Sequence, residues 1–504
     1  MRHDSLELVL GPPGTGKTTE LLDRVDRLLA GGVDPSRIGY LAFTRRAAEE
    51  AKSRACARFN LAPGQLPNFR TVHSLAYHSL GMSQDRMFST HALREFSDLM
   101  GLDIRGRVDL SEGGVWGIGK GDTLMFHEQL ARSRGVSVEH IWRENDADYA
   151  LSELTRVQKG LKVFKSSRGL VDFTDLLELS VKEGAFPALD TLFIDEAQDL
   201  SRAQWVAVEA IAAKADHVVC AGDDDQAIYR FAGADSSTFL SLVGRRTVLR
   251  QSHRVPASIQ KLASVLLRRI EGPRFEKEWA PRNADGALEY VGAPSDVDLG
   301  AGHWLVLGRN NYLLRPFEEL CRESGWYYST KWGGAADPAV TAAIEAWGAL
   351  RAGEAVAHGQ ATAVFDQIPS GAGIVRGGKT SLKSRDPDEK FTFENLSTDF
   401  GLLAQGEWFQ ALTRIPLIER EYLLSCVRQG EEISGTPRVR LSTIHGAKGG
   451  EADNVLLLTD CSQRTSANAD RFPDDEVRTF YVGATRAKQS LTVCEPQNRF
   501  AFQI

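Results

Sequence analysis

Short apolar runs alternate with amphipathic stretches near the start of the chain. Residues 6–10 predict a buried strand, a loop rich in glycine and proline follows, and residues 18–30 predict a helix. A second strand is predicted at 38–43, and it leads into a helix at 47–59. Strands that alternate with helices are typical of a parallel, doubly wound sheet, which binds its ligands at the carboxyl ends of its strands.

The same pattern continues and then restarts. Residues 75–185 are predicted to be mostly helical, and residues 369–390, rich in glycine, predict a loop. The further predicted strands lie at 191–194, 217–221, 287–291, 304–307, 438–443, 455–458 and 491–493. The predicted fold class is therefore α/β, with two parallel-sheet lobes, each carrying a mainly helical insertion.

Composition places the chain among ordinary globular proteins. It has 504 residues, too many for one hydrophobic core, with 42% apolar and 25% charged residues. No apolar run approaches the roughly 18–20 residues that cross a bilayer, so we expect no membrane partner. Six scattered cysteines without a CxxC pair argue against a zinc ribbon or a disulfide framework. They fit a reducing compartment, so we expect a cytoplasmic protein.

Two further observations limit the function. The net charge of −7 means that any nucleic-acid binding must use local basic patches. A cleaved signal peptide would remove the glycine-rich loop that follows residue 10, so we expect none.

That loop carries the strongest chemical signal. Gly11-Pro-Pro-Gly-Thr-Gly-Lys-Thr18 fits the pattern G-x-x-x-x-G-K-[ST], in which backbone N–H groups and a helix N-terminus bind phosphate. Lys17 is expected to reach the β- and γ-phosphates of ATP, and Thr18 to place its hydroxyl on Mg²⁺. The alternative is a glycine-rich turn with an exposed lysine. The predicted nucleotide-binding residues are Gly11, Pro12, Pro13, Gly14, Thr15, Gly16, Lys17, Thr18 and Thr19.

An acidic strand end supplies the second half of a nucleotide site. The strand at 191–194 delivers Asp195 to its tip, where a carboxylate can hold Mg²⁺. Glu196 follows and can take the proton from an attacking water. The alternative is an acidic strand end that merely caps a helix.

The order of these motifs carries a family resemblance. Asp195-Glu-Ala-Gln-Asp199 and Gly222-Asp-Asp-Asp-Gln-Ala-Ile-Tyr229 resemble motifs of the UvrD/Rep/PcrA group of superfamily 1 helicases. Other segments match that family's motifs in order, at 41–48, 71–74, 171–177, 250–254, 441–449 and 480–487. The match covers nearly the whole chain and is weakest in the two insertions. It implies a single-strand DNA translocase of 3′→5′ polarity.

The resemblance also implies a domain layout. The first RecA-like lobe is expected at 1–75 and 186–250, with a helical insertion at 76–185. The second lobe is expected at 251–338 and 432–504, with a reduced insertion at 339–431.

Three further side chains are implied in hydrolysis. Gln226 suits sensing of the γ-phosphate or its attacking water, and its alternative is a surface amide that caps a helix. Arg254 and Arg486, both inferred to lie on the second lobe, suit bidentate contact with phosphate. The alternative for each arginine is a surface salt bridge.

Base recognition departs from the family pattern. The family places a glutamate on the ribose and a tyrosine on the adenine, and these positions correspond to Glu451 and His253. Only ten residues precede Gly11 in this sequence, so we expect no counterpart of the family's upstream adenine-reading glutamine. The resemblance therefore leaves base selectivity open.

Aromatic residues predict the nucleic-acid track, because rings stack on any base. Phe43, Tyr229 and Phe231 match stacking positions of the family, and their alternative is an ordinary hydrophobic core. Ala232 replaces the arginine that links the stacking loop to the nucleotide site in the family, so Arg230 is expected to take over that link. The predicted polar contacts to phosphates are Thr44, Arg45, Thr71, His73, Ser74, Thr443 and His445; the short polar ones could instead be core or capping residues.

Two functions fit this sequence best, and a third, an NTPase that remodels proteins without nucleic acid, fits it less well. The first is an ATP-dependent DNA translocase and helicase that uses single-stranded and tailed duplex DNA and acts as a monomer. The second is a DNA-stimulated ATPase that serves a nuclease or a replication or repair partner without unwinding on its own.

Overall fold

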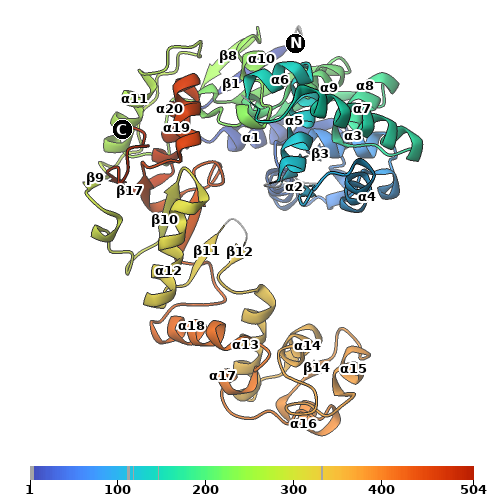
Figure 1. The fold of residues 1–504 in the computed structure, drawn as a ribbon, viewed down its shortest axis with the longest axis vertical. Helices are drawn as coiled ribbons and strands as arrows, with labels where there is room; N and C mark the ends of the chain where they lie inside the picture. The colour runs from blue at the N-terminus through green and yellow to red at the C-terminus, as the bar shows by residue number, and fades with distance from the viewer. Residues whose placement is uncertain (1–4, 110–113, 117–118, 146, 331–332) are drawn as a thin grey trace. The chain divides into compact units, whose positions relative to one another are not determined.

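The computed structural model describes residues 5–109, 114–116, 119–145, 147–330 and 333–504. The chain forms two compact units, and Figure 1 shows their elements. Unit 1 comprises Met1–Ala284 with Phe472–Tyr481, and unit 2 comprises Asp285–Arg471 with Val482–Ile504.

Unit 1 contains a six-stranded parallel sheet in the order β3-β2-β6-β7-β1-β8. Its central strands are nearly continuous apolar runs, as expected for strands covered on both faces. The strands are β1 (Leu6–Leu10), β2 (Ile38–Leu41), β3 (Phe69–Arg70), β6 (Leu189–Ile194), β7 (Ala215–Gly222) and β8 (Arg245–Val248). The helices that connect or follow them are α1 (Lys17–Ala30), α2 (Arg45–Phe59), α3 (Val72–Ser79), α9 (Arg202–Ala212), α10 (Ser236–Leu240) and α11 (Ala257–Leu267).

The segment between β3 and β6 is mostly helical, as predicted, and has its own apolar core. Figure 1 shows α5, α7 and α8 close together in this part of unit 1. Its elements are α4 (Thr90–Met100), β4 (Arg107–Asp109), β5 (Gly114–Trp116), α5 (Lys120–Arg134), α6 (Val138–Glu144), α7 (Leu151–Arg168) and α8 (Phe173–Glu183).

Unit 2 contains a seven-stranded sheet in the order β12-β11-β15-β10-β16-β17-β9, parallel except for the pair β11–β12. The strands are β9 (Ala287–Val291), β10 (Trp304–Gly308), β11 (Tyr328–Thr330), β12 (Gly333–Gly334), β15 (Val439–Thr443), β16 (Ala452–Leu458) and β17 (Ala487–Cys494). Helices α12 (Arg315–Ser324) and α19 (Gln463–Arg471) belong to this unit, and α20 (Pro473–Ala484) begins in unit 1 and ends in unit 2. Two parallel sheets confirm the predicted α/β fold class.

A second helical segment lies between β12 and β15. Figure 1 shows α14, α15 and α16 gathered around β14. Residues 369–390 were predicted to form a loop, but they contain α15, and Ile374 and Leu382 are fully buried. Its elements are α13 (Pro338–Arg351), β13 (Val356–Ala357), α14 (His358–Asp366), α15 (Gly378–Lys383), β14 (Lys390–Phe391), α16 (Phe393–Asp399), α17 (Trp408–Ala411) and α18 (Leu417–Arg428).

Two segments of the predicted second lobe, 251–284 and 472–481, pack in compact unit 1. The second lobe was expected to begin at residue 251, whereas 251–284 pack in unit 1. The Ser252 hydroxyl donates to the Pro13 carbonyl oxygen at 2.8 Å, which ties this segment to the glycine-rich loop. Arg254 therefore belongs to unit 1, and the other predicted boundaries stay predictions.

A buried group of charges stabilises the helical segment of unit 1. Arg132 of α5 pairs with Asp172 at 2.6 Å and with Asp175 at 2.5 Å, at the start of α8. Lys165 of α7 contacts the same two carboxylates. Glu128 lies one turn before Arg132, is 2% exposed, and its Oε2 atom has no hydrogen-bond partner among the described residues. Burial, aided by the nearby Asp172, raises the pKa of Glu128 to about 7.

We expect Glu128→Gln to flatten the pH dependence of stability. Between the usual carboxyl pKa and about 7 the folded Glu128 keeps a proton that the unfolded chain has lost, so the free energy of unfolding falls as the pH rises through this window. In the wild type, the free energy of unfolding should fall by about 3 kcal/mol across this window, and in the Gln variant this fall should be absent. Urea denaturation at pH 5 and pH 8 measures it. Glu50→Gln, on the exposed face of α2, should behave like the wild type; identical pH dependence in the Glu128 variant contradicts the assignment.

Candidate nucleotide and nucleic-acid site

The glycine-rich loop joins β1 to α1 in the arrangement that binds phosphate. Gly14 and Gly16 have φ of 71° and 81°, a left-handed conformation that side chains rarely adopt. The Lys17 Nζ atom donates to the Gly11 carbonyl oxygen at 2.8 Å, and the Thr15 hydroxyl donates to the Pro12 carbonyl oxygen at 2.8 Å. The loop is therefore closed on itself, with its lysine held over the backbone.

The predicted magnesium residues meet at the tip of β6. The Thr18 hydroxyl donates to Asp195 Oδ2 at 2.8 Å, and the Tyr40 hydroxyl donates to the same oxygen at 2.8 Å. Burial and the neighbouring Glu196 raise the pKa of Asp195, and these two hydrogen bonds and Lys17 oppose the rise. A cation at this carboxylate would oppose it further.

Glu196 has an unusual backbone. Its φ is 52°, and among the described residues only Asn60 shares a positive φ without being glycine. The Gln198 side-chain amide donates to Glu196 Oε2 at 2.6 Å, which fixes the direction of the carboxylate. Strain of this kind gathers at functional sites.

Gln226 lies in the turn that follows β7. Its side-chain amide donates to Asp223 Oδ2 at 2.6 Å, and it is 5% exposed. The Asp223 backbone N–H donates to Gln198 Oε1 at 2.9 Å. The predicted sensor and the predicted base are thus connected through Gln198 and Asp223.

The segment that contains Arg254 packs directly on the glycine-rich loop. The His253 backbone N–H donates to the Gly14 carbonyl oxygen at 2.8 Å. A Cβ atom added at Gly14 would lie 2.3 Å from Arg254 Cβ, so only glycine fits there. The side chain of His253 is exposed. Unit 1 therefore brings Arg254 and His253 to the loop.

Unit 2 brings the remaining two nucleotide candidates together. Arg486 is 1% exposed, and its guanidinium donates to the carbonyl oxygens of Val482 at 2.9 Å and Gly450 at 3.3 Å. Its backbone carbonyl accepts from the Ala452 N–H at 3.1 Å. Glu451 lies between those two contacts and is exposed.

The three predicted stacking residues form a row in unit 1. The rings of Phe43 and Tyr229 are stacked, with centroids 5.4 Å apart, and the Tyr229 and Phe231 centroids lie 6.3 Å apart. Phe43 is half-buried, whereas Phe231 is 47% exposed. The row therefore begins in the core and ends at the surface.

Several predicted phosphate contacts lie at helix N-termini. The Thr44 hydroxyl accepts from the Ala47 N–H at 3.2 Å and caps α2, while Arg45 is exposed beside it. The Thr71 hydroxyl accepts from the Ser74 N–H at 3.2 Å and caps α3. The capping alternative thus applies to both threonines, and both helix N-termini still favour an anion.

His73 lies within the first turn of α3. Its ring makes an edge contact with Phe173, with centroids 5.3 Å apart. Burial lowers the pKa of His73 to about 4, despite the nearby Asp172. The imidazole is therefore neutral at physiological pH.

Thr443 and His445 lie in unit 2, at the end of β15. The Thr443 hydroxyl accepts from the Gly446 N–H at 3.1 Å, so this threonine also holds a turn.

Sequence reasoning missed three residues of the site. Tyr40 is the second partner of Asp195, Gln198 orients Glu196, and Lys277 contacts Asp223. Gln198 stands inside a recognised motif and could have been found there. Lys277 lies 54 residues from Asp223 in a stretch without periodicity, so no local signal marks it.

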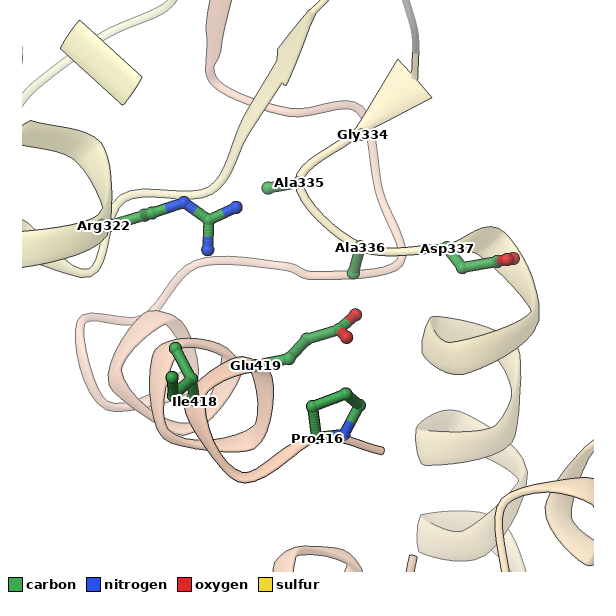
Figure 2. Close-up of a pocket in the computed structure, with 8 residues that line it drawn as sticks. All are labelled: Arg322, Gly334, Ala335, Ala336, Asp337, Pro416, Ile418 and Glu419. Carbon is green, nitrogen blue, oxygen red and sulfur yellow. The ribbon is translucent and has the colours of Figure 1, made fainter. Parts of the chain in front are cut away.

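A cavity of about 300 Å³ lies elsewhere in unit 2 and includes none of the predicted site residues. Figure 2 shows the side chains of Arg322 and Glu419 beside it. Asp337 also lines it, but its carboxylate caps α13 by accepting from the Ala339 N–H at 2.8 Å. The cavity therefore does not extend the nucleotide site.

Comparisons with known proteins agree with the geometry. The family model described as the UvrD/REP helicase N-terminal domain matches residues 3–245, and the model described as the UvrD-like helicase C-terminal domain matches residues 411–497. Within the described part of the chain, no helix has the length and apolar character needed to cross a membrane.

Curated relatives are similar at low identity. The ATP-dependent DNA helicase PcrA of Staphylococcus epidermidis is 23% identical over 308 residues, which is 58% of this chain and 42% of that protein. PcrA of Bacillus subtilis is 24% identical over 375 residues, 64% of this chain and 48% of the relative. A probable DNA helicase II homolog of Rickettsia conorii is 22% identical over 379 residues, which is 64% of this chain and 54% of that protein.

The chain spans about half the length of these relatives. A crystal structure of the Arterivirus nonstructural protein 10 helicase has a TM-score of 0.35 and 12% identity, covering 98% of this chain and 60% of that one. The fold assignment therefore stands on the two sheets. Because the two family models together match well over half of it, the chain belongs to the UvrD/REP helicase family.

Proposed function

We propose that this protein is an ATP-dependent translocase on single-stranded DNA that unwinds tailed duplexes with 3′→5′ polarity. The observation that carries the proposal is the loop after β7. At one end of this loop, Gln226 is hydrogen-bonded to Asp223 beside the nucleotide candidates. Three residues later, Tyr229 belongs to the row of stacking rings. A change at either end of so short a loop displaces the other.

The side chains support hydrolysis of ATP. Lys17 neutralises charge on the β- and γ-phosphates once its ammonium leaves the Gly11 carbonyl oxygen. The hydroxyl of Thr18 and the carboxylate of Asp195 are hard oxygen ligands 2.8 Å apart, a donor set that fits Mg²⁺. Bound there, the ion would neutralise developing charge on the phosphates. Glu196 accepts the proton of the attacking water, and Gln226 orients that water.

Arginines complete the chemistry. Arg254, beside Gly14, contacts the γ-phosphate from unit 1. We also propose that Arg486 contacts phosphate and that Glu451 contacts the ribose. Such an arginine is typically worth about 10³–10⁵ in rate. DNA bases stack on Phe43, Tyr229 and Phe231 while the helix N-termini at Thr44 and Thr71 bind the backbone.

We place this activity in the cytoplasm of a bacterial or phage-infected cell and expect the protein to act as a monomer. Its task there is either unwinding on its own or service to a nuclease or repair partner. Strand displacement from a 3′-tailed duplex, with a 5′-tailed duplex as control, separates these functions. ATPase stimulation without displacement would support the accessory function.

Lys17→Ala should lower ATP hydrolysis by at least about 100-fold, because the variant loses the charge over the phosphates. Binding of a fluorescent oligonucleotide should stay unchanged, since Lys17 faces the glycine-rich loop. Rates with and without single-stranded DNA measure the effect. Lys182→Ala, an exposed lysine of α8, is the control. Wild-type hydrolysis in the Lys17 variant contradicts the site, and a wild-type rate that DNA does not raise contradicts the function.

Phe231→Ala should weaken DNA stimulation without affecting folding, because the ring is about half exposed. A lost stack costs about 1–3 kcal/mol per base, so the DNA concentration for half-maximal stimulation should rise about 5- to 150-fold. Tyr290→Ala removes an equally exposed ring from β9 and should change nothing. An unchanged DNA requirement in the Phe231 variant means that this row does not stack on DNA.

The loop is also tied to α20, the helix that leads to Arg486. The Arg230 guanidinium pairs with Asp475 of α20 and lies 3.5 Å above the Phe472 ring centroid. It also contacts Glu144 of α6 at 3.1 Å. We propose that these contacts replace the family arginine whose position is held here by Ala232.

Arg230→Ala and Asp475→Asn should each lower DNA-stimulated turnover while DNA affinity stays within about threefold, because Phe231 is retained. The double variant should lose little more than either single one, with a coupling energy of about 0.5–3 kcal/mol. Steady-state ATPase rates of the wild type, the two single variants and the double variant at saturating DNA give the double-mutant cycle. Strictly additive losses mean that the two residues act separately.

A further inference from the structure

A lysine that no motif includes is buried against the turn after β7. The side chain of Lys277 is 1% exposed. Its Nζ atom lies 2.7 Å from Asp223 Oδ1 and 2.9 Å from Asp225 Oδ2, and it also contacts Asp224. The three aspartates are at most 1% exposed. One ammonium therefore contacts three consecutive buried carboxylates.

These carboxylates have the spacing of a cation site, since one oxygen from each lies within 4.8 Å of the others. The Lys277 ammonium supplies the cation. Arg274 adds a second charge by a bidentate pair with Asp225, at 2.8 and 2.7 Å. The Phe275 N–H donates to Asp224 Oδ2 at 2.9 Å. Residues 274–277 thus hold the turn from one side.

The contact with Asp223 is the one that reaches the nucleotide site. Lys277 binds Oδ1 of this carboxylate, while Oδ2 accepts from the Gln226 amide at 2.6 Å. Burial alone would raise the pKa of Asp223, but the charges of Lys277 and Lys17 keep it below its ordinary value. The ionised carboxylate stays an acceptor, so the amide of Gln226 keeps one orientation.

We infer that Lys277 is a positioning residue for hydrolysis, a built-in cation that holds Gln226 in place through Asp223. The inference rests on the proposed ATPase activity. Asp223 also donates its backbone N–H to Gln198, which orients Glu196, so one ammonium supports both the sensor and the base.

Lys277→Met tests this, because methionine keeps the length of the side chain and removes its charge. We expect kcat for ATP, measured without DNA and per folded molecule, to fall about 10- to 100-fold, the usual loss when a supporting residue is removed. The KM for ATP should stay within about threefold, since the Gly11–Thr18 loop is intact. Lys277→Arg retains the charge and should recover most of the rate.

Lys165→Met is the matched control. Lys165 is also buried, with 8% of its side chain exposed, and also contacts two carboxylates, but in the helical segment of unit 1. This variant should lose stability and keep its kcat. Wild-type kcat in folded Lys277→Met overturns the inference, as does an equal loss in Lys165→Met. Absence of hydrolysis in the wild type instead refutes the proposed function itself.

If Lys277→Met does not fold, Lys277→Met combined with Asp224→Asn removes one buried carboxylate and restores the balance of charge. Asp223 still lacks its ammonium in this variant, so a low kcat supports the positioning role. A return to the wild-type kcat shows that Lys277 only offsets charge and overturns the inference.

Discussion

Parallel pairing of β6, β7 and β1 is the constraint on which the site depends. Leu10 pairs with Gly222 and Ile194 pairs with Cys220, so the three strands end at the same edge. The Gly11 N–H then donates to the Gly222 carbonyl oxygen at 3.2 Å. Residues far apart in sequence meet because their strands stop together, and a shift of register would separate loop, acid and sensor at once.

Two buried aspartates at this edge differ in protonation chemistry. Burial and Glu196 raise the pKa of Asp195, whose partners are the hydroxyls of Thr18 and Tyr40. Asp223 is buried as deeply, yet its pKa is lowered because Lys277 stands against it. The protein therefore supplies a cation to the carboxylate that positions a neighbour. Among the described residues, the side chains that donate hydrogen bonds to the carboxylate of Asp195 are the neutral hydroxyls of Thr18 and Tyr40.

The elements that depend on the local sequence pattern are the ones that could be predicted. Most strands of the two sheets follow from apolar runs, and the glycine-rich loop follows from a spacing of glycines that few other structures need. The short strands β3, β8, β11 and β12 were not predicted. The loop predicted at 369–390 contains a helix, α15, that was missed, because Leu382 and the pair Ile374-Val375 stand among glycine and charged residues. The burial of Ile374 and Leu382 depends on α14 and neighbouring elements, which no short window contains.

Long-range contacts explain the other differences. The packing of 251–284 in unit 1 depends on single hydrogen bonds and ion pairs, such as those of Ser252 and Lys277. Such contacts leave no periodicity in the sequence. The row of Phe43, Tyr229 and Phe231 could be expected only from a family resemblance, because a phenylalanine after a strand is ordinarily a core residue.

The left-handed backbone of Glu196 has a consequence for how this protein can evolve. A non-glycine residue in that conformation costs about 1–3 kcal/mol, and glycine would relieve the cost. Selection for thermal endurance alone would therefore replace Glu196 and discard the carboxylate proposed as the base. Glutamate at this position therefore lowers the stability of the fold while supplying the carboxylate that turnover needs. Variants from laboratory evolution toward heat resistance should be screened for replacement of Glu196.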